Sequence, residues 1–195
     1  MKRVFIIHGW DGYPEEGWFP WLKRELEKKD FRVTVPAMPE AVAPKIETWV
    51  AHLAKVVGQV DENTFFVGHS IGCQTILRYL ESLPTDQIAG GVVLVAGWIN
   101  RLNGDLSPKE LVIAKPWIET PINLLRVKQM AKKFTAIFSD NDEFTRLTTE
   151  NEEIFKNQLG AKVIEEHNKG HFSGSDGVTK LPSVLKAITE MGFVF

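Results

Sequence analysis

Cysteine is almost missing from this chain of 195 residues, and so is an excess of charge of either sign. Cys73 is the single cysteine, which excludes a disulfide within the chain and is typical of a reducing compartment. The formal net charge of −2 provides no global field that favours nucleic acid, a membrane surface or a strongly charged substrate. No apolar run approaches the roughly 18 residues of a transmembrane helix. We therefore expect a cytoplasmic protein that binds neither nucleic acid nor membranes.

Sequence patterns that bind cofactors are absent as well. The chain contains no G-x-G-x-x-G and no P-loop, the two glycine-rich patterns that hold dinucleotides and phosphates. Its His, Cys, Asp and Glu residues show no metal-ligand spacing. We expect no cofactor and no metal, and the sequence contains no signal for an oligomeric state.

The beginning of the chain has the outline of a signal peptide, because Met1–Arg3 is basic and Val4–Ile7 is apolar. That apolar stretch is too short, and it runs into His8 and Gly9 with no small-residue cleavage site. We interpret it as a first β-strand. With 44% hydrophobic and 25% charged residues, the composition is that of one compact globular domain, which we expect to span residues 1–195.

Short apolar runs alternate with amphipathic stretches along the chain. Most of the runs are apolar throughout, as in strands that are buried on both faces of a parallel sheet. The last run is more polar, which favours an edge position. We predict an α/β fold, a compact and mostly parallel sheet of about six strands with helices on both faces. The expected strands are Val4–Ile7, Phe31–Val35, Phe65–Val67, Val92–Val95, Phe134–Phe138 and Lys162–Glu165, and the expected helices are Phe19–Lys29, Lys45–Val57, Cys73–Glu81, Thr145–Leu159 and Leu181–Met191.

The segment 97–132 is too long for a simple crossover between two strands. It is rich in large apolar residues, and we predict a small cap-like helical insertion whose Trp98 and Trp117 line a pocket at the carboxyl ends of the strands. The alternative is a crossover helix with a long loop, whose tryptophans belong to the core.

The residues Gly68–Gly72 read G-H-S-I-G, between an expected strand and an expected helix. This is the context of a nucleophile elbow, a tight turn that exposes a serine Oγ on a strained backbone. Ser70 is therefore the candidate nucleophile. The alternative is a glycine-rich turn with an incidental serine.

A serine hydroxyl needs an adjacent base, and the base needs an acid to orient it. In the chain order Ser, acid, His of this fold class, His167 and His171 are possible bases, and we favour His171 because its loop leaves from the rim that carries Ser70. Asp142 follows the fifth strand and is our choice of acid, with Asp140 as the alternative.

The oxyanion of an acyl-transfer intermediate needs backbone donors. We expect the N–H groups of Ile71, next to the nucleophile, and of Trp10, in the loop after the first strand. His8 opens that loop, and we expect it either to orient the loop through hydrogen bonds or to border the substrate pocket.

Four segments together resemble one known family: Val4–Gly9, Trp18–Leu22, Gly68–Gly72 and Asn168–Phe172. The chain is similar to the small α/β-hydrolases of the retinoblastoma-binding-protein-9 type, and in particular to their bacterial YdeN-like branch. The resemblance runs over nearly the whole chain. It implies a compact sheet that lacks the first strands of larger α/β-hydrolases.

The resemblance also implies a catalytic triad that falls on Ser70, Asp142 and His171. The chain departs from the family pattern after the acid, where Glu143 and Phe144 stand in place of an apolar residue and proline. Taken together, these observations predict a serine hydrolase that cleaves small carboxylic esters through an acyl-enzyme. The alternatives are a non-catalytic protein-binding module on a hydrolase scaffold, or an acyltransferase or other acyl hydrolase.

Overall fold

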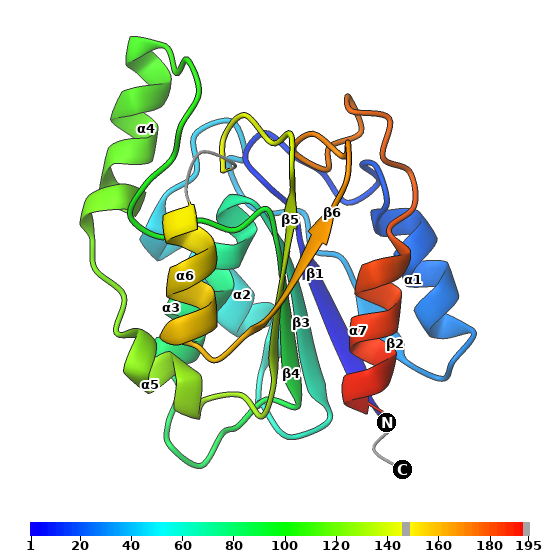
Figure 1. The fold of residues 1–195 in the computed structure, drawn as a ribbon. Helices are drawn as coiled ribbons and strands as arrows, with labels where there is room; N and C mark the ends of the chain where they lie inside the picture. The colour runs from blue at the N-terminus through cyan, green and yellow to red at the C-terminus, as the bar shows by residue number, and fades with distance from the viewer. Residues whose placement is uncertain (146–148, 193–195) are drawn as a thin grey trace.

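A six-stranded sheet forms the centre of the molecule (Figure 1). The computed structural model describes residues 1–145 and 149–192. All neighbouring strands pair in parallel, in the order β2-β1-β3-β4-β5-β6, and this confirms the predicted fold class. The strands are β1 (Arg3–Ile7), β2 (Arg32–Thr34), β3 (Thr64–His69), β4 (Gly91–Val95), β5 (Phe134–Ser139) and β6 (Lys162–Glu166).

Burial follows the position of each strand in the sheet. Every residue of β3, β4 and β5 is buried, which explains why these strands are apolar on both faces. The edge strand β6 is exposed or half-buried along its length, as its polar sequence predicts.

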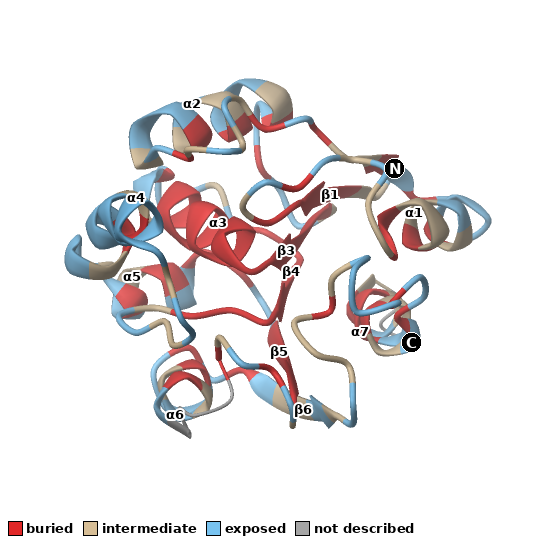
Figure 2. Cartoon of the chain, turned by 90° about the horizontal axis from the view of Figure 1, so that it is seen from above, coloured by how far each residue is buried: buried red, intermediate tan, exposed pale blue. Residues whose placement is uncertain are grey.

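The helices form two layers, one on each side of the sheet (Figure 2). Helices α2 to α6 cover one face, and α1 and α7 cover the other, so that the sheet separates two apolar clusters. The predicted helix Thr145–Leu159 is seen as α6 from Thr149 onward, and residues 146–148 lie outside the described residues. The helices are α1 (Phe19–Glu27), α2 (Ile46–Val57), α3 (Ile71–Ser82), α4 (Pro108–Glu119), α5 (Leu124–Gln129), α6 (Thr149–Asn157) and α7 (Pro182–Gly192).

The segment 97–132 contains two helices with different surroundings. Helix α4 projects beyond the carboxyl ends of the strands, at the upper end of Figure 1. It begins with a capping box, in which Ser107 and Glu110 satisfy each other's backbone N–H groups. Helix α5 lies near the opposite end of the sheet, where Leu124 and Val127 pack into the larger apolar cluster. Of these two helices, α4 therefore stands at the rim where ligands bind in this architecture, and α5 does not.

Candidate active site

Ser70 occupies the turn between β3 and α3, in a conformation that is rare for a residue with a side chain. Its φ is 51° and its ψ is −122°. The backbone is held there by a hydrogen bond of 2.9 Å from the Ser70 N–H to the Val95 carbonyl of the neighbouring strand β4. A strained backbone that the surrounding structure enforces is typical of a functional turn.

The two glycines of this turn allow the chain to pass very close to its neighbours. A Cβ atom at Gly68 would lie 2.8 Å from the Cα of Cys73, and one at Gly72 would lie 2.4 Å from the Ile7 carbonyl oxygen. Real side chains do not tolerate such distances from backbone atoms. The G-x-S-x-G pattern is therefore a packing requirement, because α3 starts directly against β1 and β3.

His171 and Asp142 approach each other from two neighbouring loops, the one after β6 and the one after β5. The His171 Nδ1 lies 3.0 and 2.9 Å from the two carboxylate oxygens of Asp142. The Asp142 side chain is fully buried, whereas that of His171 keeps 17% of its surface exposed. An Nδ1–H that donates to the carboxylate leaves Nε2 of the neutral ring free to accept a proton.

The Asp142 carboxylate is also held from its own loop. It accepts hydrogen bonds from the Phe144 N–H at 2.9 Å and from the Thr145 hydroxyl at 2.5 Å. Burial by itself would raise the pKa of Asp142. The hydrogen bond and charge of His171, together with the hydrogen bonds from Thr145 and Phe144, outweigh burial and lower this pKa below its usual value. Asp142 is consequently charged at neutral pH and can stabilise a protonated His171.

The loop that carries His171 is anchored by its backbone. The carbonyl of His171 accepts a hydrogen bond of 2.7 Å from His69 Nε2, and the carbonyl of Phe172 accepts one of 3.0 Å from Trp18 Nε1. The N–H of His171 donates to the Asp176 carboxylate at 3.0 Å. The residue before the candidate nucleophile thus holds the residue that serves as the candidate base.

His69 performs this task as a neutral ring. Burial, together with the charge of nearby His171, lowers the pKa of His69 to about 3. Because its Nε2–H faces a carbonyl, its Nδ1 carries a lone pair, and this buried atom has no hydrogen-bond partner among residues 1–145 and 149–192. Sequence reasoning missed the role of His69, since the position is variable in the G-x-S-x-G pattern.

Ser70 and His171 line the same cavity, which has a volume of about 470 Å³. Within the described part of the chain, no hydrogen bond joins the two side chains. In structures without substrate such catalytic hydrogen bonds are often long, and they tighten only when substrate is bound.

The backbone donors expected for an oxyanion lie next to Ser70. A Cβ at Gly9 would be 3.3 Å from the Ser70 Cβ, which places the loop after β1 beside the nucleophile. Ile71 is the first residue of α3, where an N–H has no acceptor within the helix. In the described ranges, neither the Ile71 N–H nor the Trp10 N–H is used by another hydrogen bond.

His8 holds the loop after β1 and does not line the cavity, so its prediction as a pocket residue is corrected. Its Nε2 accepts the Met38 N–H at 3.0 Å, and its Nδ1–H therefore donates to the Gly9 carbonyl at 2.8 Å. Burial lowers the pKa of His8, which keeps the ring neutral in this position.

The predicted pocket residues Trp98 and Trp117 are corrected in the same way, because neither lines the cavity. Both side chains are buried in the larger apolar cluster. Trp117 donates to the Pro44 carbonyl at 3.0 Å and stacks edge-on against Trp49. Trp10 and smaller apolar residues form the cavity wall instead. Of the smaller residues, Val42, Ile113 and Phe144 carry no signal in the sequence that marks them as lining. The smaller residues are Val42, Leu102, Leu106, Ile113 and Phe144.

The alternative acid and the alternative base contact each other and not Ser70. Asp140 accepts from His167 Nδ1 at 2.7 Å and from the Asn168 N–H at 2.8 Å. The hydrogen bond to Asp140 and the charge of Asp140 raise the pKa of His167, which is exposed to solvent. A further hydrogen bond joins the loops after β5 and β6, because Asn141 Oδ1 accepts the Gly170 N–H at 2.8 Å.

Two features are absent from residues 1–145 and 149–192. No group of three or more His, Cys, Asp or Glu side chains is placed to hold a metal ion. No helix there is both long enough and apolar enough to cross a membrane.

The parallel sheet with a strained serine at a strand–helix turn defines the class of α/β-hydrolases. The serine hydrolase family model matches residues 4–190, so the chain belongs to that family, as its resemblance indicates. It is 30% identical to YdeN of Bacillus subtilis over 189 residues, which are 97% of this chain and 95% of YdeN. It is 23% identical to the serine hydrolase RBBP9 of Rattus norvegicus over 161 residues, 82% of this chain and 80% of RBBP9.

Solved structures agree with this assignment. The crystal structure of the B. subtilis ydeN gene product superposes with a TM-score of 0.88 at 30% identity, and the match covers 98% of each chain. Est1E from Butyrivibrio proteoclasticus, solved with ferulic acid bound, has a TM-score of 0.72 at 14% identity, over 97% of this chain and 87% of Est1E. The likeness to Est1E concerns the fold alone.

Proposed function

We propose that this hydrolase cleaves small carboxylic esters through a triad of Ser70, His171 and Asp142. The observation that carries the proposal is the pairing of a buried, charged Asp142 with His171, whose free Nε2 shares a cavity with the strained Ser70. No other described His–carboxylate pair borders that cavity.

In the proposed reaction the Ser70 Oγ attacks the ester carbonyl carbon while His171 Nε2 accepts the hydroxyl proton. Asp142 keeps the ring in the required tautomer and stabilises the imidazolium. The N–H groups of Trp10 and Ile71 receive the oxyanion of the tetrahedral intermediate. His171 then protonates the leaving alcohol, and a water molecule activated by the same ring releases the acid from Ser70.

The test is covalent labelling with a fluorophosphonate, read by intact mass, together with hydrolysis of phenyl acetate. We expect one adduct on the wild type, none on Ser70→Ala, and a loss of about 10³-fold or more in kcat/KM for that variant. Ser183→Ala, which alters a serine of α7 that does not line the cavity around Ser70, is the matched control and should label like the wild type. A folded wild type that forms no adduct would favour the protein-binding alternative.

A further inference from the structure

The cavity around Ser70 carries more negative than positive side chains. Asp11, Glu16 and Glu110 line it with carboxylates, and Lys109 is its one lining ammonium group. The three carboxylates and the lysine form no ion pair with any residue in the described ranges. One ammonium against three carboxylates leaves a formal charge of −2 beside the Asp142–His171 pair.

The carboxylates come from two parts of the chain: Asp11 and Glu16 lie in the loop between β1 and α1, and Glu110 lies on α4. A Cβ at Gly12 would lie 2.9 Å from a Glu16 carboxylate oxygen, and one at Gly174 would lie 3.6 Å from the Glu16 Cγ. Glu16 thus lies between Gly12 of its own loop and Gly174 of the loop that follows His171. On α4, the Glu110 carboxylate accepts from the Ser107 N–H at 2.7 Å and the Ser107 hydroxyl at 2.5 Å, and these bonds lower the pKa of Glu110.

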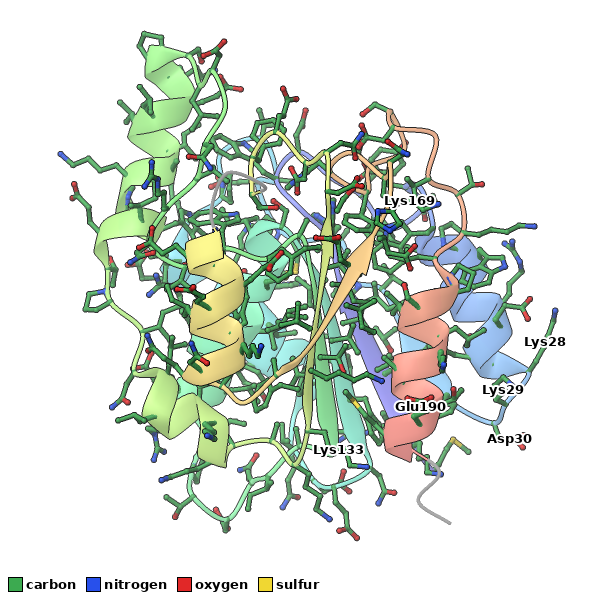
Figure 3. The ribbon with its side chains drawn as sticks, in the orientation of Figure 1. Lys28, Lys29, Asp30, Lys133, Lys169 and Glu190 are labelled. Atoms are coloured by element: carbon green, nitrogen blue, oxygen red, sulfur yellow. The ribbon has the colours of Figure 1, made fainter. Side chains whose placement is uncertain are left out.

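The opposite end of the sheet has the reverse character. A second cavity of about 610 Å³ lies there and is lined by four lysines and one glutamate, Glu190. Figure 3 shows Lys133 and Glu190 at this end, far from Lys169 at the rim. The two cavities therefore differ in the sign of their lining charges: carboxylates predominate around Ser70, and lysines, three of them paired with Glu62 or Glu190, predominate at the other end. The four lysines are Lys132, Lys133, Lys162 and Lys186.

We infer that the cavity selects its substrate by charge and takes esters whose leaving alcohol is neutral or cationic, in preference to anionic ones. This inference rests on the proposed function. The leaving oxygen must receive a proton from His171, so the alcohol lies on the His171 side of the cavity, which is also lined by Ser173, with Glu16 beside Gly174 of the same loop. Carboxylates in a partly enclosed cleft attract a cation and repel an anion. The acyl group then contacts the aliphatic wall of Leu102, Leu106 and Ile113.

The experiment compares kcat/KM for three aryl acetates: phenyl acetate, 3-(trimethylammonio)phenyl acetate and 3-acetoxybenzoate. Each value is divided by the rate of hydroxide-catalysed hydrolysis, which removes the intrinsic difference between leaving groups. We expect the cationic ester to exceed the anionic ester about tenfold at low salt, and the ratio to fall to about threefold in 0.5 M NaCl. A ratio near one, or a preference for the anion, would overturn the inference.

Charge-removing variants test whether the carboxylates cause the preference for the cationic ester. Glu16→Gln and Glu110→Gln should each lower the cation-to-anion ratio about two- to threefold, because each removes one charge and keeps its shape. The matched controls are Glu15→Gln, adjacent in sequence, and Glu119→Gln, at the other end of α4. Neither control residue lines the cavity, and both variants should keep the wild-type ratio.

The outcomes separate this inference from the proposed function. If phenyl acetate is cleaved by the wild type and not by Ser70→Ala while the ratio stays near one, charge selection fails and the hydrolase proposal stands. If Ser70→Ala cleaves all three esters as fast as the wild type, both fail together.

Discussion

Two Asp–His pairs lie two to four residues apart in the same pair of loops, and only one of them faces Ser70. The Asp140–His167 contact is the shorter, at 2.7 Å against 2.9 Å for Asp142–His171. Their surroundings differ much more than their distances. The aspartate and histidine side chains are 35% and 74% exposed in the first pair, and 0% and 17% in the second.

The comparison shows that anchoring distinguishes the two pairs, whereas contact distance does not. Asp142 is fixed by Thr145 and Phe144, and the His171 backbone is fixed by His69 and Asp176. Exposed ion pairs are weakened by solvent and by the entropy of long side chains, so they contribute little. Catalysis requires a base that is already oriented when substrate arrives.

The largest effect should come from removing the two histidines in turn. We expect His171→Ala to lower kcat/KM for phenyl acetate by about 10³- to 10⁴-fold, because the serine loses its base. His167→Ala should stay within about twofold of the wild type. Initial rates on purified, folded variants measure both, and equal losses would mean that the exposed pair takes part in the reaction.

The aspartates should repeat the contrast with a smaller effect. Asp142→Asn should reduce kcat about 10³-fold, since an amide favours the wrong tautomer of His171 and cannot stabilise its imidazolium. Asp140→Asn should reduce it less than about threefold. Steady-state kinetics measure kcat for both variants, and thermal unfolding verifies that each is folded. Similar activities of the two variants would contradict the assignment of the acid.

His69 provides a finer test of the anchoring argument. His69→Leu removes the N–H that holds the His171 carbonyl, and we expect kcat to fall about tenfold with KM nearly unchanged. His69→Gln keeps an N–H at the same reach and should restore most of kcat. A loss of stability with no change in kcat per folded molecule would show that the residue serves packing alone.

The two pairs should also respond to pH in opposite directions, with the smallest effect. The pKa of His167 is raised above its ordinary value of 6.5, so its pair with Asp140 stabilises the fold fully below that pH and less as pH rises through the folded-state pKa. The pKa of Asp142 is lowered, so its contribution is present above the ordinary value of 3.8 and is lost as pH falls through the folded-state pKa.

The measurement for this pH effect is the melting temperature of wild type and Asp140→Asn between pH 5 and pH 9. We expect the wild type to melt slightly higher at pH 5, by less than about 2 °C, and the difference to vanish by pH 9. A difference that grows with pH would contradict the direction given for His167.

The sequence was sufficient for the sheet because apolar runs such as Val92–Val95 have no other stable position than the centre of a parallel sheet. The sequence left the choice between Asp140 and Asp142 as a prediction. The two residues lie in one loop, and the shape of that turn determines which carboxylate reaches the rim. The tryptophans were misplaced for a related reason. A sequence shows that Trp98 and Trp117 are apolar, but only their long-range partners, such as Pro44 for Trp117, decide between core and pocket.

One further feature has a practical use in spectroscopy. Cys73 is fully buried, and its burial raises the pKa of the thiol, so maleimide reagents will leave it unmodified in the folded protein. Because the chain has no other cysteine, a single new thiol would be labelled uniquely without a cysteine-free background. Val112, which is 72% exposed on α4, is a suitable place for a fluorophore or spin label. Such a probe would report from α4, which lines the cavity, while substrate enters and product leaves.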